Sequence, residues 1–218
     1  MILKYLLMIP SLLCVVPICN LVNKFTGDKE LARKTGHTLE HFILLFGCIV
    51  IFEGTVHSVF LPFLYSIVAT ILMHLKVKQL DFLERDNGNT NRCCTLFAGG
   101  AFMLLSILTL IDTRFKVPFI LGVFALNFGD SAAALIGKRF GKYSMKFKNG
   151  KSAIGSLAFI IATFISINIL MLCIGFEVVL WKLLVLSIVG AFMEFFSDDL
   201  DNFLIPITVG FLAFVLLF

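Results

Sequence analysis

Residues 153–174 read AIGSLAFIIATFISINILMLCI, a stretch without any Asp, Glu, Lys or Arg. An α-helix needs about 20 predominantly apolar residues to cross the hydrocarbon core of a bilayer. The stretch therefore predicts a transmembrane helix. The whole composition fits the same class, because 59% of the 218 residues are apolar and only 15% are charged. An average soluble domain carries about 25% charged residues.

Apolar windows of similar length recur along the chain. They cover residues 3–23, 38–56, 58–75, 95–111, 117–136, 153–174, 178–196 and 203–218. These windows predict an all-α fold, a polytopic transmembrane helical bundle of about eight spans. The second and third windows are interrupted only by the short region around Glu53 and Gly54, so seven spans with a re-entrant pair is the alternative. We expect one integral membrane domain over residues 1–218, with no soluble domain attached.

Basic residues concentrate in alternate connections between the windows. With eight spans, 14 of the 18 Lys and Arg residues fall in the first, third and fifth connections, within residues 24–34, 76–92 and 138–151. Short basic connections stay on the cytoplasmic side of a membrane. We therefore expect these three connections, and the acidic segment 197–202 as well, at the cytoplasmic face.

Asp130 is a carboxylate inside an apolar span, about two helical turns before the basic segment. An ionisable side chain at that depth costs several kcal/mol unless it is paired, so a functional role is the default hypothesis. The small residues around it, Gly129 and 131–134, allow neighbouring helices to approach closely. The alternative is an Asp that only joins two helices through a basic partner.

The segment after this span, Gly137-Lys138-Arg139-Phe140-Gly141-Lys142, combines two glycines with three cations. Such a segment lets backbone N–H groups and side chains approach a polyphosphate. Lys151-Ser152 then opens the next span, where a helix N-terminus favours an anion. The segment is not a P-loop, because Met145 stands where the first Gly of that motif belongs. A basic segment that only sets topology or binds anionic lipid heads is the alternative.

Carboxylates gather near the same expected face. Besides Asp130, the acidic and amide side chains concerned are Glu194, Asp198, Asp199, Asp201 and Asn202. Carboxylates together with substrate phosphates are the usual ligands of Mg²⁺. We therefore expect these six residues to supply the ligands of Mg²⁺ or another divalent cation.

A second polar motif lies before the second window, in Arg33-Lys34-Thr35-Gly36-His37. Its continuation through Glu40 and His41 matches the H-x-x-E-H pattern of inverted zinc proteases. So short a pattern arises easily by chance, and no further acidic ligand is evident downstream. Polar contacts from His37 and Glu40 to a nucleotide or to a lipid hydroxyl fit better.

Taken in order, these motifs resemble the CTP-dependent lipid-alcohol kinases, the family of dolichol, polyprenol and phytol kinases and CTP-dependent diacylglycerol kinases. The resemblance covers residues 32–37 and 129–208, and residues 38–128 match no motif. Its elements are the basic pair with His37, Gly129-Asp130, the glycines at 137 and 141, Lys151-Ser152 with Gly155, Glu194, and Asp201-Asn202 with Pro206. The chain lacks the C-terminal His-Gly-Gly and Asp-Arg of the related phosphatidate cytidylyltransferases.

The resemblance implies transfer of a phosphate from CTP to the hydroxyl of a membrane lipid alcohol, with Mg²⁺ or another divalent cation. Implied nucleotide contacts are Gly137, Lys138, Gly141, Lys142, Lys151, Ser152, Arg33, Lys34 and His37. The implied catalytic residues are Asp130, Lys151 and Asp201, with Asp130 first in line to accept the proton of the alcohol. No nucleic acid is expected as a partner.

The lipid and the membrane follow from the same resemblance. Ile154 stands where dolichol kinases tend to carry Glu, whereas the short spacing from Glu194 to Asp201-Asn202 resembles dolichol kinases. We favour dolichol or another polyprenol, with phytol, farnesol or diacylglycerol as alternatives. The resemblance places the protein in the endoplasmic reticulum membrane of a eukaryote or the plasma membrane of a prokaryote, with a cytoplasmic active site.

Two alternatives belong to other classes of protein. A transporter of an anionic solute would also carry Asp130 and Glu194 inside its bundle, at broken helices. It would take up solute without consuming nucleotide. A membrane scaffold without catalytic activity would tolerate neutralisation of all these carboxylates.

The charge distribution makes a prediction about topology. Single cysteines at Asn149 and Asp199, in a background without other cysteines, should react with an impermeant thiol reagent only from the cytoplasmic side. A cysteine at Arg114 should react only from the opposite side. Labelling of position 199 from the outer side would contradict both the eight-span count and the shared location of the basic and acidic segments.

Overall fold

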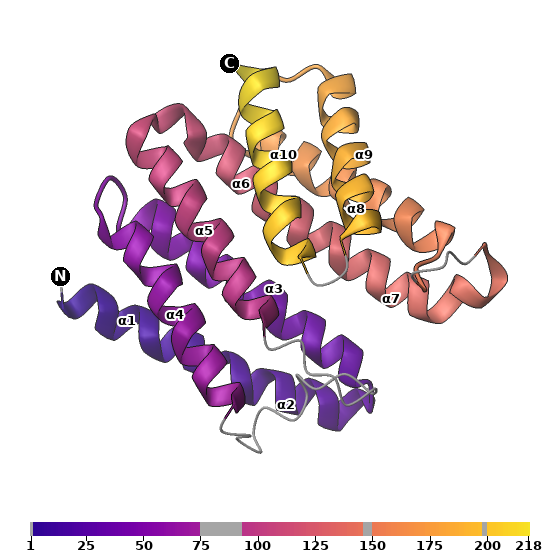
Figure 1. The fold of residues 1–218 in the computed structure, drawn as a ribbon, viewed down its shortest axis with the longest axis horizontal. Coiled ribbons are helices and arrows are strands. Elements are labelled where there is room, and N and C mark those ends of the chain that lie inside the picture. The colour runs from indigo at the N-terminus through magenta and orange to yellow at the C-terminus, as the bar shows by residue number, and fades with distance from the viewer. Residues whose placement is uncertain (1, 75–92, 146–149, 198–199) are drawn as a thin grey trace. The chain divides into compact units, whose positions relative to one another are not determined.

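The computed structural model describes residues 2–74, 93–145, 150–197 and 200–218 (Figure 1). Every regular element in these ranges is an α-, π- or 3-10 helix, and no strand occurs among them. The all-α prediction is therefore confirmed for this part of the chain.

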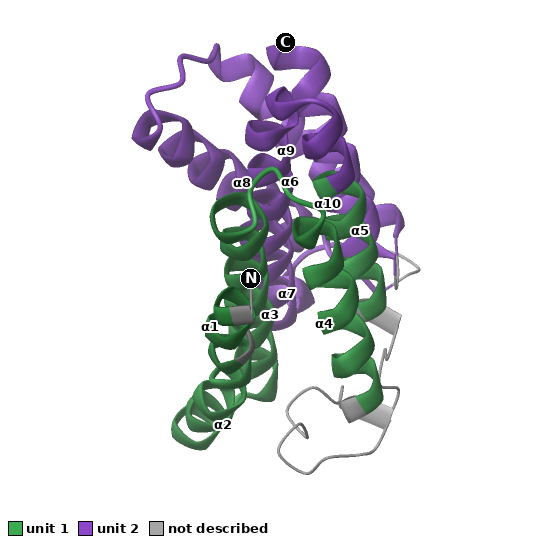
Figure 2. Ribbon diagram, turned by 90° about the vertical axis from the view of Figure 1, so that its left-hand side faces the viewer, with its two compact units in different colours: residues 1–106 green, residues 107–218 purple. Residues whose placement is uncertain are grey.

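The chain divides into two compact units, Met1–Ser106 and Ile107–Phe218, which Figure 2 shows in different colours. The division rests on contacts between residues and does not define folding domains. The single-domain prediction therefore stays a prediction. Each unit is described below by itself.

Unit 1 contains five α-helices and a π-helical turn among its described residues. They are α1 (Ile2–Leu13), α2 (Val15–Thr26), α3 (Lys29–Phe46), the π-helical η1 (Gly47–Ile51), α4 (His57–His74) and most of α5 (Cys93–Ile111). Helix α2 packs against α3, and a buried cluster of Val15, Cys19 and Ala32 lies between them.

The basic segment before the second span is helical, and the prediction of a loop there is wrong. Only two residues separate α2 from α3: Gly27 adopts a left-handed φ of 66°, and the Asp28 carboxylate accepts hydrogen bonds from Glu30 N and Leu31 N. An Asp in this position satisfies the unpaired N–H groups of the first helical turn. Arg33 then pairs with Glu30 one turn earlier, at 2.5 Å. Capping and this pairing favour helix over loop.

Unit 2 begins with a continuous helical stretch and adds three further helices. The stretch comprises the 3-10 turn η3 (Thr113–Phe115), α6 (Lys116–Phe124), the π-helical η4 (Ala125–Asp130), α7 (Ser131–Phe140) and the 3-10 turn η5 (Gly141–Tyr143). Helices α8 (Ala153–Cys173), α9 (Leu180–Phe196) and α10 (Asp201–Leu217) follow.

The predicted span 117–136 is therefore too short at its C-terminal end. Gly137 to Phe140 are the last residues of α7, and Gly141 and Lys142 lie in η5, so the basic segment is helical at its start. Alanine and leucine at 132–135 are strong helix formers, and cations in the last turn complement the helix dipole. Asp201 and Asn202, expected in a loop, likewise form the first turn of α10.

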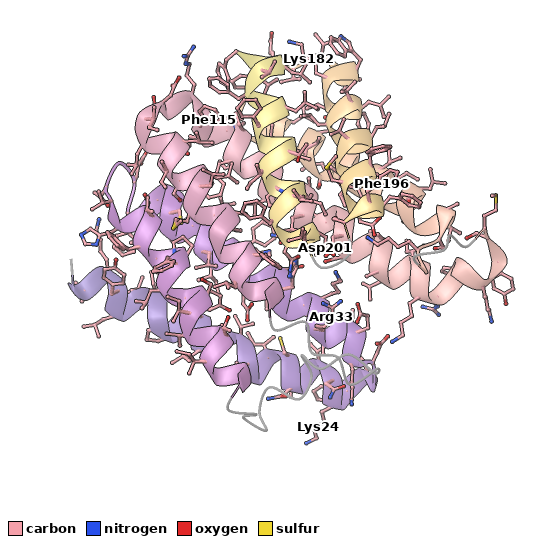
Figure 3. The ribbon with its side chains drawn as sticks, in the orientation of Figure 1. Lys24, Arg33, Phe115, Lys182, Phe196 and Asp201 are labelled. Atoms are coloured by element: carbon pink, nitrogen blue, oxygen red, sulfur yellow. The ribbon has the colours of Figure 1, made fainter. Side chains whose placement is uncertain are left out.

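The four long helical segments of unit 2 run antiparallel to their neighbours. Helix α7 packs on α8, α8 on α9, α9 on α10, and α10 on α6. Phe115 stacks on Phe214 with ring centroids 3.8 Å apart, and Lys182 Nζ donates to the carbonyl of Leu216 at 2.5 Å. Phe115 and Lys182 thus mark one end of the unit, whereas Phe196 and Asp201 lie toward the other (Figure 3). That other end, where α7 and α9 finish and α8 and α10 begin, is called the convergent end.

Three helical stretches in the described residues are long and apolar enough to cross a membrane: Leu3–Thr26, Thr113–Tyr143 and Ala153–Cys173. Shorter apolar helices cover His57–Ile71, Leu96–Ile111 and Asp201–Leu217. The start and end of α8 agree closely with the predicted span 153–174. The count of eight spans stays a prediction.

Close approach of α6 to α10 depends on Gly122. A Cβ at this position would come within 2.3 Å of the backbone oxygen of Pro206. At Gly137 in α7, the nearest atom to a Cβ would be the Ser152 hydroxyl oxygen at 3.3 Å, a side-chain contact and a longer one.

We expect Gly122→Ala to lower the free energy of unfolding by about 1–3 kcal/mol, because the two helix backbones must separate. Gly137→Ala is the matched control, and it should cost less than Gly122→Ala, because its Cβ would meet a side-chain oxygen at 3.3 Å and Ala is the better helix former by about 1 kcal/mol. Denaturant unfolding in detergent micelles measures both variants. Equal stabilities for the two would contradict this account of the α6–α10 contact.

Candidate functional site

Asp130 lies at the end of the π-helical turn η4 and is only 6% exposed. Asn127, on the same turn, is 1% exposed. Helix α8 lies directly against this turn, since a Cβ at Gly129 would come within 2.4 Å of Thr163 Oγ1 and 2.6 Å of the Phe159 ring. π-helical turns inside longer helices occur frequently at functional sites. The burial of Asp130 that the sequence indicated is thus present in the structure.

Lys151, just before α8, reaches the last turn of α9. Its Nζ lies 3.0 Å from Glu194 Oε1 and donates to the carbonyls of Glu194 and Ser197, the latter at 2.8 Å. The Lys151 side chain is 20% exposed and that of Glu194 is 10% exposed. The sequence assigned the lysine to nucleotide phosphates and the carboxylate to a metal ion, whereas here the two form an ion pair. Both assignments stay predictions.

Ser152 caps α8, and its Oγ accepts a hydrogen bond from Gly155 N at 3.2 Å. Three glycines surround this side chain. A Cβ at Gly141 would lie 3.0 Å from Ser152 Oγ, and one at Gly155 would lie 3.1 Å from the carbonyl of Ala133. The glycines at 137, 141 and 155 therefore allow α7 and the start of α8 to approach closely. This packing role is an addition to the predicted role of Gly137 and Gly141 at a nucleotide.

Exposed cations occupy the end of α7. Lys138, Arg139 and Lys142 are all exposed. Lys142 Nζ lies over the Tyr143 ring at 4.8 Å, and the Arg139 guanidinium lies over the Phe140 ring at 5.8 Å. Exposed cations in the last turn of a helix are available to an anionic ligand from solvent.

The first turn of α10 supplies the acidic side of the convergent end. Asp201 Oδ1 accepts a hydrogen bond from Asn202 N at 2.8 Å, and Asn202 is 7% exposed. Asp198 and Asp199 lie outside the described residues. Within the described residues, no group of three or more His, Cys, Asp or Glu side chains is arranged to hold a metal ion. Mg²⁺ is usually bound through one or two carboxylates together with phosphates, a donor set that Asp130, Asp201 and Asn202 fit.

The remaining predicted nucleotide contacts belong to unit 1. Arg33 pairs with Glu30, Lys34 is buried, and the rings of His37 and His41 are 4.1 Å apart at their centroids. Burial, followed by the charge effects of His41, Lys34 and Arg33, holds the pKa of His37 well below its usual value, so the imidazole is neutral. The role of these residues at a nucleotide stays a prediction.

Sequence reasoning missed two features of this region. Asn127 precedes Asp130 by three residues and is on the same turn, so helical spacing would have drawn attention to it. The pairing of Lys151 with Glu194 joins residues 43 apart and depends on the antiparallel packing of α8 and α9. No local pattern indicates that contact.

Comparison with known proteins gives one informative similarity. Over 92 residues the chain is 37% identical to a protein named dolichol kinase sec59 from Schizosaccharomyces pombe. The match covers 42% of this chain and only 18% of the length of that relative. No protein-family model matches the chain, and no solved structure matches it. The similarity supports a dolichol kinase-like relationship and, with the apolar helices, an integral membrane protein.

Proposed function

We propose that this protein transfers a phosphate from CTP to the hydroxyl of a membrane lipid alcohol, dolichol or another polyprenol, at the cytoplasmic face. The observation that carries the proposal is the buried carboxylate of Asp130, on the same continuous helical stretch as the exposed cations Lys138 and Lys142. The similarity to a dolichol kinase supports the choice of reaction and of lipid.

Phosphoryl transfer requires charge neutralisation and in-line placement more than covalent chemistry by the protein. Lys138 at the end of α7 and Lys142 in η5 would bind the phosphate oxygens. Asp130, about two helical turns deeper, would accept the proton of the lipid hydroxyl as that oxygen attacks the terminal phosphate. The depth suits an alcohol that lies in the bilayer and a nucleotide that arrives from water.

A divalent cation such as Mg²⁺ would neutralise the negative charge of the phosphates when bound. Asp130, Asp201 and Asn202 are the described residues that would hold it, with Asp198 and Asp199 as further ligands in our proposal. Glu194, paired with Lys151 at 3.0 Å, would join them only by giving up that lysine. Phytol, farnesol and diacylglycerol remain alternative acceptors, and the choice between endoplasmic reticulum and plasma membrane depends on the organism.

Asp130→Asn should lower turnover at least about a hundredfold while the protein stays folded, because the amide cannot accept a proton. The assay uses purified protein in detergent, CTP labelled in its terminal phosphate, and a panel of dolichol, phytol, farnesol and diacylglycerol. The matched control is Asp112→Asn, at the opposite end of unit 2. Hydrogen bonds from Arg114 hold the pKa of Asp112 below its usual value, so this variant also removes a negative charge.

Asp112 caps the turn that opens unit 2, and Asn caps equally well, so this control should keep full turnover. Turnover of Asp130→Asn within about threefold of the parent, under 1 kcal/mol in barrier, would exclude a catalytic role for Asp130. Equal turnover with ATP would contradict the CTP assignment and leave a lipid kinase. Uptake of an anionic solute into vesicles without nucleotide consumption would replace the proposal with a transporter.

A further inference from the structure

Lys151 contacts more of its surroundings than a phosphate-binding lysine needs to. On the basis of the proposed function, we propose that Lys151 is a positioning residue for the phosphoryl transfer. It holds the C-terminal end of α9, and through it the Asp201–Asn202 turn, and it does not bind the nucleotide phosphates.

The donors of the ammonium group are already used. A lysine ammonium has three N–H donors. Three acceptors among the described residues surround Lys151 Nζ: Glu194 Oε1 at 3.0 Å, the carbonyl of Ser197 at 2.8 Å and the carbonyl of Glu194. A phosphate oxygen would therefore have to displace one of these acceptors.

If a phosphate took the Lys151 ammonium group, the acceptors that it now contacts would lose a hydrogen-bond donor, at a cost in free energy. The last carbonyls of an α-helix have no N–H partner within the helix, and a cation at that end satisfies them and complements the dipole. The Glu194 side chain is only 10% exposed, and removing one partner of a buried ion pair is strongly destabilising. Lys138 and Lys142 are exposed, so a phosphate can reach them from solvent without displacing the acceptors of Lys151.

The anchored helix α9 packs against α10, whose first turn is the predicted metal-binding turn. Ser197 precedes Asp201 by four residues. Leu200, between them, accepts hydrogen bonds from Phe203 N at 3.0 Å and Leu204 N at 2.8 Å, which begin α10. Because α10 packs against α9, holding the C-terminal end of α9 restricts where Asp201 and Asn202 lie.

The residue that follows Lys151, Ser152, makes a second set of contacts between helices. Ser152 caps α8 and contacts the glycine positions of α7 and η5. The dipeptide Lys151-Ser152 thus joins the cationic end of α7 to the end of α9, the helix on which α10 packs. Loss of the lysine should disturb how these two helix ends are placed relative to one another more than it affects the affinity for nucleotide.

The opposite end of unit 2 offers a matched control. Lys182 Nζ donates to the carbonyl of Leu216 in the last turn of α10, a contact of the same kind. Lys182→Met removes the lysine contact from the C-terminus of α10, at the opposite end of unit 2 from the proposed site. It should lower thermal stability in the same way as Lys151→Met and leave turnover unchanged.

The experiment compares Lys151→Met, Lys182→Met and Lys138→Met in full-length protein in detergent. For Lys151→Met we expect kcat to fall at least about thirtyfold with the KM for CTP within about threefold of the parent. Lys138→Met should instead raise the KM for CTP about tenfold or more. Amide hydrogen exchange of residues 201–204 should accelerate in Lys151→Met alone, because only this change releases the start of α10.

A raised KM with unchanged kcat in Lys151→Met would overturn the inference and make Lys151 a phosphate ligand. Unchanged exchange at 201–204 would overturn it as well, and this readout needs no turnover. Failure of the parent protein to use CTP would therefore reject the proposed function without deciding the role of Lys151.

If Lys151→Met does not fold, Lys151→Arg and Glu194→Gln carry the test. Lys151→Arg keeps a cation beside Glu194, and Glu194→Gln keeps an oxygen acceptor beside Lys151. Both variants should therefore retain the parental KM for CTP and lose less than about tenfold in kcat. Abolished turnover in Glu194→Gln with normal exchange at 201–204 would make Glu194 a metal ligand and contradict the positioning role.

Discussion

The contact of Lys151 with the last turn of α9 is the interaction on which the rest of the convergent end depends. A single ammonium group neutralises the Glu194 carboxylate and satisfies two helix-terminal carbonyls. Each of these groups would be costly to bury alone, in a unit whose hydrophobic core is built from side chains such as Phe159, Leu186 and Ile205. The pairing lets polar chemistry exist at the end of an apolar bundle, and it joins the helix that follows the cations to the helix that precedes Asp201.

Small residues determine how closely the helices around this contact can approach. Gly122 lies against the backbone of α10 at Pro206, and Gly129 lies against Thr163 and Phe159 of α8. With little hydrophobic driving force between helices in lipid, close packing of this kind supplies much of their association. It also fixes the π-helical turn that carries Asp130. The position of the Asp130 carboxylate and the stability of unit 2 therefore both depend on the close packing of these helices.

Some of this arrangement could be read from the amino-acid sequence. The apolar stretch 153–174 predicted α8 within a residue at each end, and the depth of Asp130 in an apolar window predicted its burial. The helical state of residues 29–37 could not be read from hydropathy, which registers Lys29, Arg33 and Lys34 only as charges, although their helix propensity is high.

Contacts between residues that are distant along the chain could not be predicted from the sequence, for a different reason. The pair Lys151 and Glu194 depends on the register in which α8 and α9 pack, and the packing of Gly141 against Ser152 depends on the turn between α7 and α8. Neither register is encoded in a local pattern. The metal and nucleotide roles of these residues follow from resemblance and physical argument, and they need a direct measurement.

The central claim is that the cationic end of α7 and the start of α10 bind one metal–nucleotide complex. Photo-crosslinking of purified protein with a photoreactive CTP analogue, mapped by mass spectrometry, tests it most directly. The account predicts label in peptides covering both 137–145 and 200–204, lost from both together when EDTA or excess CTP is added, and kept with excess ATP. Label in one segment alone, or label that persists in EDTA, would contradict a shared site.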